Sequence, residues 1–145
     1  MTEVVVVERL IRARPETVFS FFTDATRWLL WQGVDGVVDA RVGGAFRLDV
    51  TGDGWAAGRF VEFDPPRRLV FTWGWEARGA PVPPGSSTVE IELLATAEGT
   101  LLRLVHRDLP AAERELHRMG WEHYMGRLAA RARGDDPGPD PMTGR

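Results

Sequence analysis

The sequence predicts an α+β fold in which a long helix lies across a curved antiparallel sheet. Three observations lead to this prediction. A strand and two short helices come first, a run of strands follows, and one amphipathic helix over residues 110–133 closes the chain. Aromatic residues are frequent on the predicted strands and on that helix. A helix over such a sheet can leave a cavity, so a pocket protein is the leading hypothesis.

The first part of the chain contains the signals of a strand and two short helices. Residues 4–11 are β-branched and apolar, which is typical of a strand. Pro15 stands where a first helical residue would be. Thr23 or Asp24 can cap a second short helix that runs through Leu30.

The middle of the chain alternates apolar and polar residues, as antiparallel strands with one solvated face do. Glycine pairs, an Asp-Pro-Pro turn and a Glu-Gly hairpin separate the strands. The predicted strands cover residues 37–41, 45–50, 55–63 and 69–75, followed by a hairpin around residues 89–93 and 102–106. A Pro/Gly-rich loop over residues 79–87 is of the kind that borders a pocket.

The last predicted helix carries an apolar stripe formed by Trp121, Tyr124, Met125 and Leu128. Its length would be about 35 Å, and Gly134 can end it. The length of 145 residues suits one domain. We therefore predict a single domain over residues 1–133 and a flexible or extended tail over residues 134–145.

Composition excludes several kinds of chemistry. The chain has no cysteine and no lysine, since all 18 basic residues are arginines, so disulfides, thiol nucleophiles and lysine Schiff bases are excluded. The net charge is -3 and no basic run exists, which disfavours nucleic-acid binding. No apolar segment approaches a membrane span. We expect a cytoplasmic protein, and the sequence leaves a homodimer open.

Several motifs resemble one family when they are taken in order. They are Pro15 to Phe19, Trp31, Asp39 to Phe46, Glu62 to Trp73, Leu102 to His106, and Gly120-Trp121. Over roughly residues 3–132 the chain is similar to Hsp90-ATPase-activator-homologue-like (AHSA1-like) proteins, which belong to the START-like, or SRPBCC, superfamily.

This resemblance implies the helix-grip (START/Bet v 1-like) fold, with an antiparallel sheet wrapped around the C-terminal helix. Many relatives bind apolar ligands in the cavity, and some are cyclases or other enzymes. Because this fold hosts many functions, the resemblance supports a pocket and does not select a reaction.

The candidate ligand-binding residues are those expected to face the cavity. They are Trp28, Trp31, Phe46, Phe60, Phe71, Trp73, Trp75, His106, His117, Trp121 and Tyr124. Each aromatic residue has two interpretations, plain core or pocket wall. The wall interpretation gains weight because six tryptophans are many for this length, and a buried indole N–H needs a partner.

The three histidines are considered separately. His106 shares a strand face with apolar residues, so it either bonds a neighbouring structural group or serves as a polar anchor of the pocket. His117 shares the stripe of Trp121, whereas His123 is expected at the surface or rim. Their spacing argues against a three-histidine metal site. We predict no transition metal and no nucleotide cofactor.

These observations leave three functional hypotheses. The first is binding of a small apolar or aromatic molecule in the cavity. The second is a non-covalent acid/base enzyme of the cyclase or dehydratase kind, using His106, His117, Tyr124 or Glu62. The third is a protein-interaction module related to the Hsp90-type co-chaperone. No serine lies in a nucleophile elbow, so covalent catalysis is disfavoured and no catalytic residue is assigned.

Overall fold

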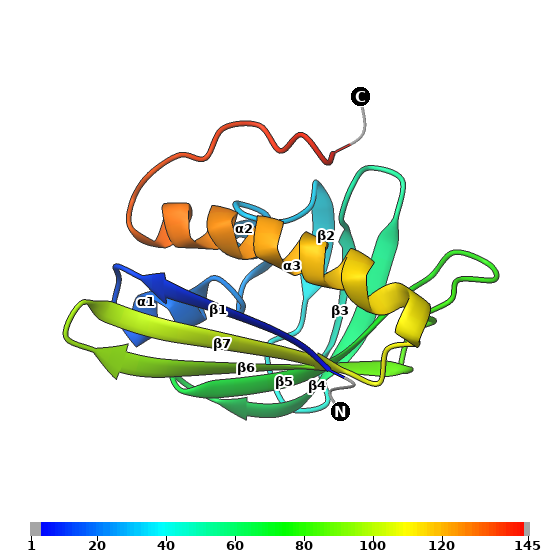
Figure 1. The fold of residues 1–145 in the computed structure, drawn as a ribbon, viewed down its shortest axis with the longest axis horizontal. Helices are drawn as coiled ribbons and strands as arrows, with labels where there is room; N and C mark the ends of the chain where they lie inside the picture. Colours follow the sequence, from blue (N-terminus) through cyan, green and yellow to red (C-terminus); the bar gives the residue numbers. More distant parts are fainter. Residues whose placement is uncertain (1–3, 144–145) are drawn as a thin grey trace.

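The computed structural model describes residues 4–143, and Figure 1 shows a long helix lying across a curved sheet. Residues 1–3 of the predicted domain and residues 144–145 of the predicted tail lie outside this range. The elements in order are β1 (Val5–Ile11), α1 (Pro15–Ser20), α2 (Ala25–Trp28), β2 (Asp35–Val38), β3 (Ala45–Asp49), β4 (Trp55–Asp64), β5 (Arg68–Trp75), β6 (Ser87–Thr96), β7 (Gly99–Arg107) and α3 (Ala111–Ala132).

The seven strands form one antiparallel sheet in the order β1-β7-β6-β5-β4-β3-β2. The last strand of the chain therefore lies beside the first, and α3 returns over the sheet (Figure 1). This arrangement confirms the predicted α+β class and the helix-grip fold. No helix in the described part of the chain has the length and hydropathy needed to cross a membrane.

The strands of the last hairpin are longer than predicted, and two other differences concern β2 and α2. β2 lies at Asp35–Val38 because the chain turns at Asp39, whose carboxylate accepts a hydrogen bond from Arg41 Nε at 3.1 Å. Gly44 then packs so closely that an added Cβ would lie 1.9 Å from the Asp39 carbonyl oxygen. α2 ends at Trp28, two residues before the predicted end, and Asp24 rather than Thr23 is its cap.

The core contains a large aromatic cluster that joins α2 to the sheet. Trp28 lies at its centre, with ring centroids 5.6 Å from Trp31, 5.5 Å from Phe46 and 5.7 Å from Phe71. The members of the cluster are nearly inaccessible to solvent. Contacts at these distances are typical of favourable aromatic packing.

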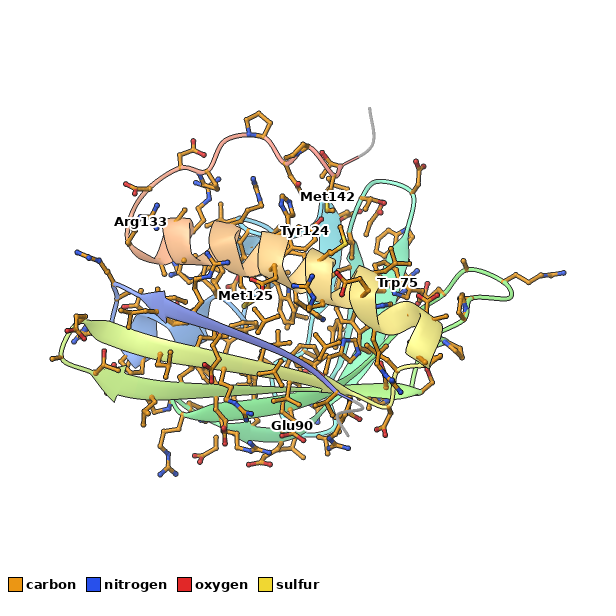
Figure 2. The ribbon with its side chains drawn as sticks, in the orientation of Figure 1. Trp75, Glu90, Tyr124, Met125, Arg133 and Met142 are labelled. Atoms are coloured by element: carbon orange, nitrogen blue, oxygen red, sulfur yellow. The ribbon has the colours of Figure 1, made fainter. Side chains whose placement is uncertain are left out.

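The opposite face of the sheet carries the predicted rows of glutamate and arginine. Glu90 accepts a hydrogen bond from Arg107 Nε at 2.6 Å, which holds the pKa of the Glu90 carboxyl below its usual range. Arg68 pairs with Glu92 at 2.9 Å and with Glu62 at 3.0 Å. Figure 2 labels Glu90 on the side of the sheet away from α3. The alternation along β6 and β7 thus separates core and solvent faces as predicted.

Candidate functional site

A cavity of about 280 Å³ lies between α3 and the end of β5. Figure 2 shows three labelled residues of its lining along α3: Trp75 from β5, Tyr124 from α3 and Met142 from the C-terminal segment, residues 134–143. The lining consists of Gln32, Val50, Thr51, Trp73, Trp75, Glu113, Leu116, His117, Gly120, Trp121, Tyr124 and Met142. Leu116 and Met142 are exposed, so the cavity opens to solvent at this edge.

Three indole rings form much of the wall. Trp73 and Trp75 alternate with Gly74 on β5, and their ring planes are nearly perpendicular, at 88° with centroids 5.6 Å apart. Trp121 on α3 lies 5.1 Å from Trp73, and the angle between the planes is 58°. Gly74 has no room for a side chain, because an added Cβ would lie 2.1 Å from the Pro83 carbonyl oxygen. The loop after β5 thus packs directly against the strand that carries Trp73 and Trp75.

His117 holds one of these walls in place. Its Nε2 accepts a hydrogen bond from Trp75 Nε1 at 3.1 Å, and its Nδ1 lies 2.9 Å from the Glu113 carbonyl oxygen. Since Nε2 is an acceptor, the proton is on Nδ1, which donates to that carbonyl. Both ring nitrogens are therefore engaged in hydrogen bonds.

His106 lies in the middle of a buried hydrogen-bond chain. Trp121 Nε1 donates to His106 Nδ1 at 2.9 Å, and His106 Nε2 donates to Ser87 Oγ at 2.8 Å. The Ser87 hydroxyl in turn donates to the Trp73 carbonyl oxygen at 2.6 Å. Burial and the neighbouring His117 lower the pKa of His106 to about 3. His106 thus holds the Trp121 ring in position through this hydrogen bond, and it is not itself a lining residue of the cavity.

The structure divides the eleven predicted site residues between two places. Five of them line the cavity: Trp73, Trp75, His117, Trp121 and Tyr124. The other six lie in the core and do not line it: Trp28, Trp31, Phe46, Phe60, Phe71 and His106. The strand residues among them face inward as the alternation predicts, and the rings of Trp28, Trp31, Phe46 and Phe71 pack against one another and fill the space beside α2.

Seven further lining residues were not among the predicted site residues: Gln32, Val50, Thr51, Glu113, Leu116, Gly120 and Met142. Gln32 is buried, and its Oε1 accepts a hydrogen bond from Trp28 Nε1 at 2.9 Å. Glu113 and Gly120 lie on the same side of α3 as His117, at helical spacings that could have indicated them. Met142 belongs to the C-terminal segment, and no local pattern pointed to it.

The C-terminal segment runs back along α3 without forming a helix or strand (Figure 1). Asp140 lies 2.7 Å from His123 Nε2, and Arg127 donates to the Gly138 carbonyl oxygen at 2.9 Å. These contacts place His123 under the segment, with about a quarter of its side chain exposed. Burial and the nearby Asp140 carboxylate raise the pKa of the Tyr124 hydroxyl above its usual range.

No metal site accompanies the cavity in the part of the chain that is described. Within residues 4–143, no three side chains of the metal-binding types His, Cys, Asp or Glu are grouped to hold an ion.

Fold and site together define a helix-grip protein with an indole-walled cavity under its long helix. The family model described as "Activator of Hsp90 ATPase homolog 1-like protein" matches residues 12–133, and the chain belongs to this family. No curated protein matches the chain.

Solved structures of similar proteins agree with this assignment. An AHSA1-like protein from Rhizobium etli is 46% identical, with a TM-score of 0.76 over 98% of this chain and 89% of that one. CalU16 from Micromonospora echinospora is 30% identical, with a TM-score of 0.75 over 94% and 69%. An HSP90 activator from Plasmodium falciparum is 25% identical, with a TM-score of 0.70 over 88% and 94%.

Proposed function

We propose that this protein binds a small apolar or aromatic molecule in the cavity beneath α3. The observation that carries the proposal is the wall of three tryptophans around a space of about 280 Å³. An apolar cavity of about 150 Å³ is enough for benzene, so this space suits a compact molecule of one or two rings. Cytoplasmic location remains a prediction.

The contacts of three candidate groups disfavour them as catalytic acids or bases. His106 is enclosed by Trp121 and Ser87, and both nitrogens of His117 already have partners. Glu62 lies on the outer face of the sheet, paired with Arg68 at 3.0 Å. A general acid or base needs a free proton position within reach of the substrate, and His106, His117 and Glu62 do not offer one.

A ligand screen tests the proposal. Hydrophobic and aromatic compounds should raise the melting temperature and quench tryptophan fluorescence. Binding stabilises the folded state by about 2.7 kcal/mol at a hundredfold excess over the dissociation constant. A broad library that gives neither signal would contradict the proposal.

Gly120 offers a matched control, because an added Cβ at this position meets no atom within 4 Å. Gly120→Leu should therefore fill the cavity without a clash. Replacing glycine in a helix interior also stabilises the helix, by about 0.5–1 kcal/mol for alanine. The variant should melt at or above the wild-type temperature and lose the ligand response. Ligand binding that persists in this variant would place the site elsewhere.

A second candidate function is binding to an Hsp90-type chaperone. It is supported by the family and by apolar side chains on the outer face of the sheet. Leu10 and Leu94 are both exposed, and both lie directly across from Leu101 in the strand register. Leu94→Arg should weaken co-precipitation with Hsp90 if this face is used, while Gly120→Leu should not.

A further inference from the structure

The described lining of the cavity contains an acidic side chain and no arginine. Glu113 is the one acidic residue of this lining, and both ring nitrogens of His117, the one histidine there, are already engaged in hydrogen bonds. No arginine of the described residues 4–143 lines the cavity. A bound anion would meet a carboxylate and no positive partner, whereas a bound cation would meet that carboxylate.

The Glu113 carboxylate has no arginine partner among the described residues, unlike several other acids of this chain. Its nearest basic atom is His117 Nδ1, at 3.7 Å from Oε1, and the proton on that nitrogen already goes to the Glu113 carbonyl. Glu115, two residues on, is instead held by Arg118 through two contacts, at 3.0 and 2.5 Å. The Glu113 side chain is only about one-fifth exposed.

The position of Glu113 in the first turn of α3 has a simple structural role, since a carboxylate there interacts favourably with the helix dipole. That role accounts for an acid at this position. It would be served equally by a carboxylate turned to solvent, and it does not require one on the wall of an aromatic cavity.

The indole walls add a second feature that favours a cation. Trp73 and Trp75 stand at 88° to each other, Trp121 is inclined at 58° to Trp73, and all three residues line the cavity. Aromatic faces attract cations through the ring quadrupole, and several rings around one space form the cages that bind alkylammonium groups.

We propose that the cavity selects an organic cation, namely an ammonium group attached to a compact apolar or aromatic body. The ammonium group lies beside the Glu113 carboxylate, and the body lies among Trp73, Trp75 and Trp121. This inference rests on the proposed function, since it specifies the ligand class of the same cavity.

Three probes of nearly the same shape test the proposal by titration calorimetry on the whole chain: 2-phenylethylammonium, 2-phenylethanol and 3-phenylpropionate. The ammonium should bind about tenfold more tightly than the alcohol, as a cation between aromatic rings and a carboxylate would. The carboxylate probe should bind more weakly than the alcohol. Raising the salt concentration should reduce the preference for the cation.

Two variants test whether the Glu113 carboxylate is the source of the preference for the cation. Glu113→Gln should reduce the ratio between the ammonium and the alcohol to near one while the alcohol still binds. Glu115→Gln removes the same charge two residues away, outside the cavity, and should keep the ratio. The melting temperature of each unliganded variant shows that it is folded.

The outcomes separate the two proposals. Equal binding of ammonium and alcohol by the wild type overturns the cation preference and leaves the proposed function standing. A preference that survives in Glu113→Gln also overturns it. If none of the probes binds and the wider library gives no response either, the proposed function itself fails.

Discussion

At the scale of single residues, two imidazoles hold the cavity walls. His106 accepts from the indole of Trp121 and donates to Ser87, and His117 accepts from the indole of Trp75. The indole N–H groups of Trp121 and Trp75 thereby have acceptors, whereas the buried Trp73 Nε1 has no hydrogen-bond partner among the described residues. Protonation of His106 on Nδ1 would break its bond to Trp121.

The buried His106 predicts an acid-dependent loss of stability. Its pKa is about 3 in the folded state and 6.5 in a solvated chain, so the unfolded state binds more protons between these values. The free energy of unfolding should therefore rise with pH in this range. From pH 6 to pH 5, above the usual titration of carboxyl groups, the expected loss is about 1.2 kcal/mol.

Urea unfolding at several pH values measures this slope. His106→Gln should flatten it whatever its stability at neutral pH. A slope that is the same in the wild type and in this variant would show that His106 is not the group responsible.

Trp121 predicts a large stability effect. Its side chain is buried between α3 and the sheet and donates to His106. Trp121→Ala should lower the free energy of unfolding by about 3–5 kcal/mol, as other large-to-small aromatic changes in cores do. Leu116→Ala, on the exposed side of the same helix, should change it by less than about 0.5 kcal/mol. A loss below 1 kcal/mol for Trp121→Ala would mean that α3 is docked less firmly than these contacts indicate.

How well the sequence predicts the surroundings of His106 depends on how far apart in the chain the contacting residues lie. The inward face of His106 follows from strand alternation with Leu102 and Leu104, so its burial was predictable. Its partners were not, because Ser87 and Trp121 come from other elements and meet it only once β6, β7 and α3 have packed. Hydrogen-bond partners set the tautomer and the pKa, so these also depend on the complete fold.

At the scale of elements, patterns of period 2 and 3.6 predicted nearly every strand and helix. β2 was placed too late in the chain because its polar neighbours, Asp39 and Arg41, form a side-chain hydrogen bond that turns the backbone. The path of the C-terminal segment was also unpredictable. Its Pro/Gly/Asp composition carries no period, and its contacts need His123 and Arg127, one turn apart on α3, to face it together.

The C-terminal segment therefore gives a prediction at this scale. Asp140→Ala removes the partner of His123 and leaves both His123 and Tyr124 without the carboxylate, so it should lower the free energy of unfolding by about 1–2 kcal/mol. Asp136→Ala removes an exposed carboxylate from the same segment and should have little effect. Equal results for the two variants would show that the segment is not held by Asp140.

At the scale of the whole molecule, the interior has two parts that composition alone cannot distinguish. Around Trp28 and Trp31 the rings pack against one another and fill the space, while around Trp73, Trp75 and Trp121 they leave a cavity. Cavity volume is the small difference between the space enclosed by the backbone and the side chains that occupy it. A sequence pattern places a ring inside the molecule and does not fix that difference.

The two parts should respond differently to a ligand, and this can be measured residue by residue. In protein labelled with 5-fluorotryptophan, six fluorine resonances can be assigned by single Trp→Phe substitutions. A saturating ligand in the cavity should shift the resonances of Trp73, Trp75 and Trp121, which touch it. The resonances of Trp28 and Trp31 should move much less, because close-packed rings separate them from the ligand. Shifts of similar size at all five positions would mean that the aromatic core itself opens to admit the ligand, so that the cavity seen beneath α3 is only part of the binding space.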